Sequence, residues 1–545
     1  MRSYSDRWLA LAAFVFAAGV TGCGGGGESP EVRRGSVDRI RAVLSAATDS
    51  GTVVGLVAGD TIGVSQPTVE FYRRNRYRPV WTDGGRLTEQ GAAVHAAVAG
   101  AGADGLDPMR YGHGVAAQLI AAVEAKDGLD DAALAGYLAD LDVVLSEGFM
   151  RYATDLARGT VDPDASGESW RIPRSDEPTE AVLRSAVRGD VAQIVQQMRP
   201  NTPYYGRMMQ ALERLRTVQE TGGWEPLPEG TKVEEGDSAE VVVALRARLA
   251  RSEDPREAAM AQRGTDRPWI YDRDLRAALR NFQARHALDD DGHLGAGTLR
   301  ELNHTVDERI EEVALNLDRW RWLPNDLGEF FVLVNIAGFE LEVVENHRVI
   351  ESMNVVVGQA GWHTPVFADT MEHVVVNPYW NPPESIMEEE IRPAMARDPG
   401  YLARNNFETT SDGRVRQRPG PGNALGFYKF LFPNKDNIYL HDTPADHLFA
   451  RSRRDFSHGC IRLERPADLA RLIVTKTTSH SAEDIDDMRA TGSEKWITLK
   501  QQVPVYIVYF TVWAKSDGTL QFYHDVYGHD EELRDADAVE EIAAR

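Results

Sequence analysis

Residues 438–463 concentrate reactive side chains in one short stretch, IYLHDTPADHLFARSRRDFSHGCIRL. This stretch contains His441, His447, His458 and Cys460. A free cysteine has a pKa of about 8.5, so most of it is protonated at neutral pH, and a nearby imidazole increases the fraction of nucleophilic thiolate. The residue types and their proximity therefore permit a cysteine nucleophile with a histidine base.

His441 ends a predicted strand, and it is the candidate base that reaches Cys460 from a neighbouring strand. The backbone carbonyl of Asp442 is within local reach and would fix the tautomer of the imidazole. Gly459 would let the chain turn so that amide N–H groups near the cysteine point at a developing oxyanion. Arg462 would supply a fixed positive charge that favours the thiolate or binds a substrate carboxylate.

Two alternatives to a cysteine nucleophile stay open. Zinc needs three or four ligands, and the chain has neither an HExxH motif nor paired CxxC motifs, but the three histidines and Cys460 could gather around one ion. Alternatively, Cys460 is a buried structural residue, and the histidines near it are unrelated. We favour the nucleophile because the thiol directly follows Ser457, His458 and Gly459.

The bulk composition describes a globular protein of several domains. The chain has 545 residues, of which 42% are hydrophobic and 26% are charged, and this length exceeds what one hydrophobic core normally serves. The formal net charge of −24 argues against a nucleic-acid partner, because phosphate binding requires a basic surface.

Residues 1–22 have the pattern of a secretory signal, with a basic start followed by the apolar run WLALAAFVFAAGV. This run is too short to span a membrane as a helix. The sequence Val-Thr-Gly-Cys that ends at Cys23 resembles the lipobox of bacterial lipoproteins, in which the cysteine is acylated and anchors the protein to a membrane. A plain signal peptide with an incidental cysteine is the alternative. Because the chain has 2 cysteines, acylation of Cys23 would leave Cys460 as the only thiol.

Changes in apolar periodicity divide the rest of the chain. After a tether at residues 23–60, helical spacing predicts an all-α scaffold over residues 61–226, and residues 230–304 form a separate small helical unit. Alternation with a period of two predicts a mostly β, sandwich-like domain at residues 325–515. Residues 516–545 are predicted to form a C-terminal tail. The expected fold class is therefore multidomain α+β.

An insertion at residues 384–425 interrupts the predicted β domain. Its first part has helical character, and its end, RPGPGNALG, is rich in glycine and proline. Such a segment can move as a lid that caps the site. A passive surface loop is the alternative.

The β domain resembles the catalytic domain of the L,D-transpeptidases. The resemblance rests on His441, fifteen intervening residues and then SHGC with Arg462 two positions on, and on the motifs HTPVF (363–367) and VVNPYWNPPESI (375–386). Residues 230–304 resemble a small three-helix peptidoglycan-binding domain, with an ordinary helical linker as the alternative. The order of these parts is similar to that of the large Gram-negative members of the family.

The resemblance implies a thioester mechanism on peptidoglycan stems. Cys460 would attack the carbonyl that precedes the terminal D-alanine of a tetrapeptide stem, and D-alanine would leave. The side-chain amine of a second stem would then attack the thioester and form a 3→3 cross-link, with His441 moving the protons. The oxyanion would be stabilised by the Tyr439 hydroxyl and by the amides of Gly459 and Cys460. Ser457 and His458 would belong to the same catalytic segment.

The resemblance also implies the remaining features of the site and its setting. No metal or other cofactor is expected, carbapenem-type compounds are possible inhibitors, and the protein would be periplasmic and lipid-anchored, with the outer membrane as the expected membrane. Water or a protein amine could replace the acceptor amine, and a non-catalytic peptidoglycan-binding lipoprotein is the alternative from another class. The implied substrate contacts are Tyr379, Trp380, Asn381 and Arg462.

Overall fold

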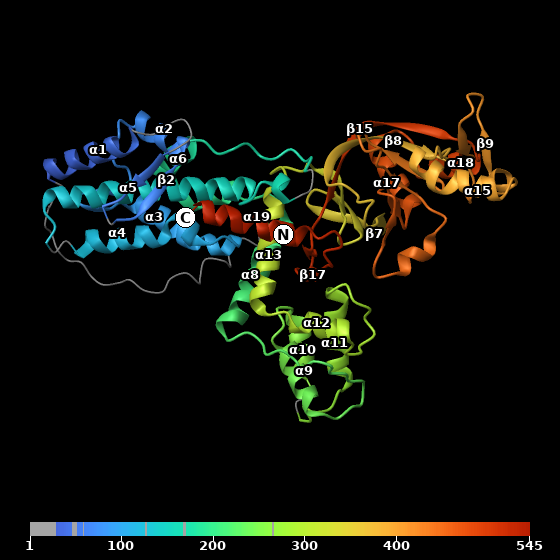
Figure 1. The fold of residues 1–545 in the computed structure, drawn as a ribbon, viewed down its shortest axis with the longest axis horizontal. Coiled ribbons are helices and arrows are strands. Elements are labelled where there is room, and N and C mark those ends of the chain that lie inside the picture. The colour runs from blue at the N-terminus through green and yellow to red at the C-terminus, as the bar shows by residue number, and fades with distance from the viewer. Residues whose placement is uncertain are drawn as a thin grey trace, which may run out of the picture.

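The computed structural model describes residues 29–45, 52–57, 59–125, 128–166, 170–263 and 266–544, and it confirms the multidomain α+β architecture (Figure 1). The predicted signal peptide and the predicted lipidation site, Cys23, lie outside the described residues. Within the described part of the chain, no helix is both long enough and apolar enough to cross a bilayer.

The N-terminal scaffold is a bundle around one long central helix, α5 (Asp131–Arg158), which is buried along most of its length. Helices α1, α3 and α4 pack against α5. The other scaffold elements are α1 (Pro30–Leu44), α2 (Gln66–Arg74), α3 (Glu89–Ala99), η1 (Gly100–Asp104), η2 (Pro108–Tyr111), α4 (His113–Ala125), η3 (Pro163–Ser166), α6 (Ala181–Arg188), α7 (Val191–Met198) and α8 (Pro203–Glu220).

The sequence predicted a tether at residues 23–60, but helix α1 and strand β1 (Thr52–Gly55) lie there. Two short hairpins are present, and the second interrupts the scaffold that the sequence predicted to be all helical. The first pairs β1 with β2 (Thr61–Val64), and their β-branched residues favour strands. The second pairs β3 (Thr82–Asp83) with β4 (Arg86–Leu87). Gly84 and Gly85 join β3 to β4 with φ of 62° and 71°, and this positive φ at both positions is what a tight hairpin turn requires.

The small unit at residues 230–304 has its own hydrophobic core and, among its described residues, four helices. These are α9 (Glu240–Ala250), α10 (Pro255–Ala261), α11 (Arg273–Arg285) and α12 (Ala296–Asn303). The sequence predicted three helices and missed α10. Its start is fixed locally, because the Asp254 carboxylate accepts hydrogen bonds from the N–H groups of Arg256 and Glu257, and Pro255 occupies the first turn.

A buried ion-pair cluster within this small unit also contacts Leu520 of the C-terminal segment. The Arg285 guanidinium contacts Glu253 at 2.6 Å and Glu257 at 3.0 Å, and it donates a hydrogen bond to the Leu520 carbonyl oxygen at 3.2 Å. Helix α13 (Val306–Arg321) then leads from the small unit into the β domain.

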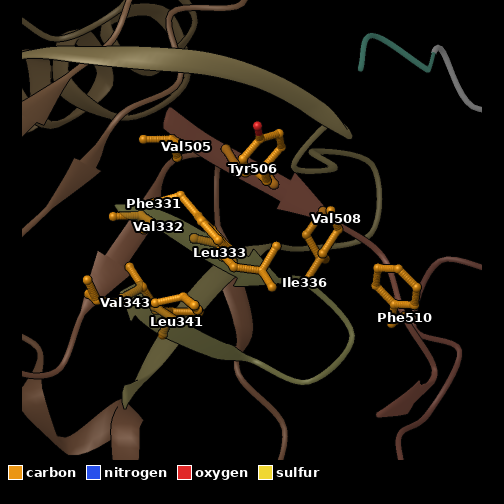
Figure 2. Packing of buried hydrophobic residues seen from close by; sticks show 14 of the residues in the cluster. Phe331, Val332, Leu333, Ile336, Leu341, Val343, Val505, Tyr506, Val508 and Phe510 are labelled. Carbon is orange, nitrogen blue, oxygen red and sulfur yellow. The ribbon is translucent and has the colours of Figure 1, made fainter. Parts of the chain in front are cut away.

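The β domain is built on one nine-stranded mixed sheet with the order β13-β7-β14-β12-β11-β8-β15-β5-β6. Strand β6 also pairs with β7, so the sheet curls and closes on itself. Figure 2 shows apolar side chains of β5, β6 and β15 packed together in its core. The strands are β5 (Phe330–Asn335), β6 (Glu340–Glu345), β7 (Arg348–Gly358), β8 (Phe367–Val376), β11 (Tyr428–Leu431), β12 (Leu440–His441), β13 (Asp455–Ser457), β14 (Ile461–Leu463) and β15 (Lys495–Val508).

The insertion after β8 forms a small lobe with an apolar cluster of its own around Met387, Ile391 and Phe407. Its elements are α14 (Glu384–Ile386), the π-helical turn η4 (Met387–Ile391), α15 (Arg392–Arg397), α16 (Tyr401–Arg404), β9 (Phe407–Thr409) and β10 (Val415–Gln417). The 3₁₀-helix η5 (Asp446–Ala450) and helices α17 (Pro466–Thr477) and α18 (Ala482–Ala490) lie further along the chain.

The C-terminal segment returns to the scaffold. A hairpin of β16 (Val512–Ala514) and β17 (Leu520–Phe522) precedes α19 (His529–Ala544), which Figure 1 draws in red beside the scaffold helices. Asp537 of α19 forms a 2.6 Å ion pair with Arg110, and Leu533 is buried against Val161 and Leu315. The segment predicted as a tail thus connects the β domain to the scaffold.

Candidate active site

Three neighbouring strands bring the reactive residues to one face of the sheet. Strand β12 pairs in parallel with β14, so that His441 lies opposite Arg462. On its other side β12 pairs with β11, which places Lys429 opposite His441. Tyr439 and Cys460 lie just before these strands. The Tyr439 ring contacts that of His441, with the centroids 5.5 Å apart, and Cys460 interacts with Tyr439, Lys429 and Arg462.

The His441 imidazole is buried, with 5% of its surface exposed. Its Nδ1 lies 2.5 Å from the carbonyl oxygen of Asp442, the partner that the sequence predicted. Donation from Nδ1–H to this oxygen leaves Nε2 as the proton acceptor. Burial, Arg462 and Lys429 lower the pKa of His441 to about 3. The ring is therefore neutral at physiological pH.

The Cys460 thiol is half-buried. Burial raises its pKa, while the Tyr439 N–H, the Lys429 ammonium, the Tyr439 hydroxyl and Arg462 act in the opposite direction because they stabilise the thiolate. The thiol is consequently protonated in the resting site at neutral pH. The thiol lies 3.7 Å from the carbonyl oxygen of Asn437.

Lys429 is a site residue that the sequence analysis missed. Its ammonium lies over the Tyr439 ring, 3.9 Å from the centroid, and its charge interacts with Cys460. Burial lowers the pKa of Lys429 and Cys460 opposes that effect. The sequence feature that could have revealed Lys429 is its position as the single lysine in the apolar and aromatic run at residues 427–432.

Backbone geometry around Gly459 changes the expected set of oxyanion donors. Gly459 has a φ of 106°, a conformation that residues with a Cβ rarely adopt. Its N–H, predicted to face the oxyanion, donates to Ser457 Oγ at 3.1 Å, and Ser457 Oγ donates to the Cys460 carbonyl oxygen at 2.6 Å. Among the described residues, the Cys460 N–H has no acceptor. The Cys460 N–H and the Tyr439 hydroxyl are the donors that remain.

Glu390 of the insertion reaches the SHGC segment. Its carboxylate lies 3.5 Å from Nε2 of His458, and its charge also interacts with the Arg462 guanidinium. The His458 ring contacts Trp362 on another side, with the ring centroids 5.2 Å apart. No hydrogen bond or ion pair links His458 to Cys460 among the described residues, so His458 belongs to the rim of the site.

The three residues predicted to contact substrate from the PYWN motif have different surroundings. The Tyr379 ring lies under the Arg416 guanidinium, 3.9 Å away, and supports the insertion. The main chain of Trp380 pairs with Gln417, and its side chain forms a hydrogen bond with Tyr439. Burial and Cys460 raise the pKa of the Tyr439 phenol, and the hydrogen bond from Trp380 opposes this increase. Asn381 is exposed.

The histidines and Cys460 do not gather around a common centre. Within the described residues, no three histidine, cysteine, aspartate or glutamate side chains are grouped so that they could hold a metal ion. His447 lies in η5, apart from the paired strands that carry His441 and Cys460.

Comparisons with known proteins agree with this geometry. A family model described as the L,D-transpeptidase catalytic domain matches residues 329–483, and one described as a scaffold domain matches residues 66–212. A curated protein of Haemophilus influenzae, named "Putative L,D-transpeptidase", is 30% identical over 272 residues, which cover 45% of this chain and 55% of that protein. The chain thus spans about half the length of this relative.

Solved structures of L,D-transpeptidases are also similar to parts of the chain. An enzyme from Mycobacterium smegmatis is 15% identical, covering 33% of this chain and 58% of that chain, with a TM-score of 0.17. One from Xylanimonas cellulosilytica is 14% identical over 52% of this chain and 100% of that chain, with a TM-score of 0.16. The imipenem complex of LdtMt1 is 14% identical over 33% of this chain and 59% of that chain, with a TM-score of 0.17.

The curled β domain of this chain is similar in sequence to the L,D-transpeptidase catalytic domain over residues 329–483. The segment with Cys460 and His441, which the sequence singled out, lies inside the matched residues.

Proposed function

We propose that this protein is a cysteine-dependent L,D-transpeptidase that joins two peptidoglycan stems by a 3→3 cross-link and releases D-alanine. The observation that carries the proposal is the parallel pairing of the strand that ends at His441 with the strand that directly follows Cys460.

In the acylation step, Nε2 of His441 takes the proton of Cys460 as the sulfur attacks the carbonyl carbon of the donor stem. The oxyanion forms near the Cys460 N–H and the Tyr439 hydroxyl, donors of the kind that stabilise such a charge. The tetrahedral intermediate collapses, the amine of D-alanine leaves with the proton from His441, and a thioester remains. Lys429 favours the transient thiolate through its charge.

In the second step, the side-chain amine of another stem attacks the thioester carbonyl. His441 takes a proton from this amine and returns one to the departing thiolate, so that Cys460 ends as it began. Arg462 is the candidate group for a stem carboxylate, because its guanidinium lies on the active face and makes no hydrogen bond or ion pair with another described residue.

Replacement of Cys460 by serine tests the nucleophile. The purified chain with residues 1–23 removed should gain the mass of an acyl group when it is incubated with a tetrapeptide stem or a carbapenem, and Cys460→Ser should not. Persistence of the adduct in the variant would contradict the assignment. A purified muropeptide assay then identifies the acceptor: a dimer supports transpeptidation, whereas a free tripeptide alone indicates that water is the acceptor.

We also propose that the protein works in the periplasm, held to a membrane by a lipid on Cys23, with residues 230–304 binding peptidoglycan. The support is the lipobox-like sequence before Cys23 and the resemblance of the small unit. Cys23→Ser should move the protein from the membrane fraction to the soluble periplasmic fraction. Continued membrane association would contradict the anchor.

A further inference from the structure

A short loop after β7 contacts the SHGC segment. It runs from Gly358 to Thr364 and is tight at its start, because a Cβ on Gly358 would lie 2.0 Å from the Trp362 carbonyl oxygen. The N–H of Gln359 donates to the Ser457 carbonyl oxygen at 3.0 Å. The loop is therefore fastened to the residue that begins the SHGC sequence.

The Thr364 hydroxyl joins this loop to the residue that precedes the nucleophile. Its oxygen accepts a hydrogen bond from the Gly358 N–H at 2.9 Å and donates one to the Gly459 carbonyl oxygen at 2.7 Å. Thr364 is fully buried. The Gly459 carbonyl thus has a fixed direction.

This direction also fixes the N–H of Cys460. The two groups belong to the same peptide unit, which is planar and trans, so they point in opposite directions. When Thr364 holds the Gly459 carbonyl on the loop side, the Cys460 N–H must point to the other side. That N–H is one of the two donors left for the oxyanion.

Tyr527, far along the chain, closes the loop. Its hydroxyl donates to the Gly358 carbonyl oxygen at 2.6 Å and accepts from the Thr364 N–H at 3.2 Å, so one group bridges both ends of the loop. Its ring stacks on His363 with the centroids 4.0 Å apart. Tyr527 lies outside the residues 329–483 that the catalytic family model matches.

Tyr527 is itself held by the turn that starts α19. Its N–H donates to the Tyr509 hydroxyl at 3.0 Å, and that hydroxyl donates to Asp525 at 2.5 Å. The Asp525 carboxylate also accepts from the N–H groups of residues 528–530. Asp530 continues the chain of contacts with a 2.6 Å ion pair to Arg319 of α13.

We propose that Tyr527 is a positioning residue of the active site, acting through Thr364 and the Gly459 carbonyl to aim the Cys460 N–H at the oxyanion. The C-terminal segment is then part of the catalytic apparatus. The inference rests on the proposed role of Cys460 as the nucleophile.

Two conservative substitutions separate this role from a purely structural one. Tyr527→Phe removes the hydroxyl and keeps the ring, and Thr364→Val keeps the shape and removes the other hydroxyl. Tyr506→Phe is the matched control, because its hydroxyl also donates to a backbone carbonyl oxygen, that of Leu327 at 3.3 Å, elsewhere in the β domain. Thermal unfolding of each variant shows whether it is folded at the assay temperature.

The readouts are acylation by a stem peptide, which needs the oxyanion donor, and alkylation by iodoacetamide, which does not. We expect kcat for acylation to fall about tenfold to a hundredfold in both variants. This loss is smaller than the loss of kcat that follows removal of an oxyanion donor itself. KM and the alkylation rate should be nearly unchanged. Thr364→Ser should restore kcat. The double variant should be no slower than the slower single variant, because both hydroxyls act through one path.

Three results would overturn the inference: a kcat for Tyr527→Phe equal to that of Tyr506→Phe, losses that multiply in the double variant, or acylation and alkylation that fall together. Failure of the proposed function has a different signature. In that case the wild-type protein itself would form no adduct on Cys460.

Discussion

Glu390 of the capping insertion lies 3.5 Å from His458 of the SHGC segment, and this contact links the inserted lobe to the segment that carries the nucleophile. The Glu390 side chain is 57% exposed. A polar contact in such an exposed setting contributes between zero and about 1 kcal/mol. The lid hypothesis requires such a weak contact, because a lid must open in every turnover.

Glu390→Gln should therefore have a small and selective effect. We expect acylation by small compounds to be unchanged, and stem cross-linking to fall by no more than about fivefold, the equivalent of about 1 kcal/mol. Glu389→Gln, a neighbouring exposed glutamate, is the control. A loss of a hundredfold or more would mean that Glu390 takes part in the chemistry and not only in closure.

Trimming residues 388–415 to a short linker tests the cover as a whole. Closure of a lobe over a thioester excludes water and orients the stem, so its removal should reduce cross-linking much more than the acylation of Cys460 by small reagents. Mass spectrometry of the adduct and chromatography of the muropeptides measure the two rates. The lid hypothesis is wrong if both rates fall equally or if neither changes.

The raised pKa of Cys460 predicts the pH dependence of its alkylation. Iodoacetamide reacts with the thiolate. As long as the pH is below the pKa of the thiol, the thiolate fraction increases about tenfold for each unit by which the pH is raised. The alkylation rate should therefore rise steadily from pH 7 to pH 9, with Cys460→Ser as the blank. A rate that levels off below pH 8 would show that the resting site holds a thiolate.

Lys429→Met removes the positive charge beside Cys460 and keeps most of the side-chain volume. Loss of a nearby cation raises the pKa of a thiol, and a change of about half a unit to one unit would slow alkylation at pH 8 about threefold to tenfold. Lys435→Met is the control, because Lys435 is exposed. Equal alkylation rates in the two variants would show that Lys429 does not affect the Cys460 thiol.

Arg285→Ala tests the buried ion-pair cluster of the small helical unit. Removing the guanidinium leaves Glu253 and Glu257 buried without their partner, and breaking a buried ion pair in this way costs about 3–5 kcal/mol of unfolding free energy. Arg280→Ala breaks the exposed pair with Asp290 and should cost less than about 1 kcal/mol. Chemical denaturation compares the two. Similar losses would mean that the cluster does not stabilise the small unit.

The sequence by itself determined the fold class and the reactive segment. Local periodicity is enough to separate a helical region from a β domain, because it reports which face of each element is buried. The spacing of His441 and the SHGC sequence was also visible, since the two neighbouring strands that carry them lie close in the chain. The Asp442 carbonyl could be named as the histidine's partner because it is the next residue.

Only the tertiary structure decided how the rest of the site is assembled. Lys429, Thr364 and Tyr527 join it through strand pairing and a returning segment, which bring into contact residues as far as 169 positions apart in the chain. Sequence spacing carries no record of such contacts. The direction of backbone groups is equally hidden. The Gly459 N–H was predicted as an oxyanion donor, but in the fold it donates to Ser457, and the Cys460 N–H is the backbone donor that stays available. Hydrogen-bond assignments of this kind depend on the complete set of neighbours, which the chain acquires only when it folds.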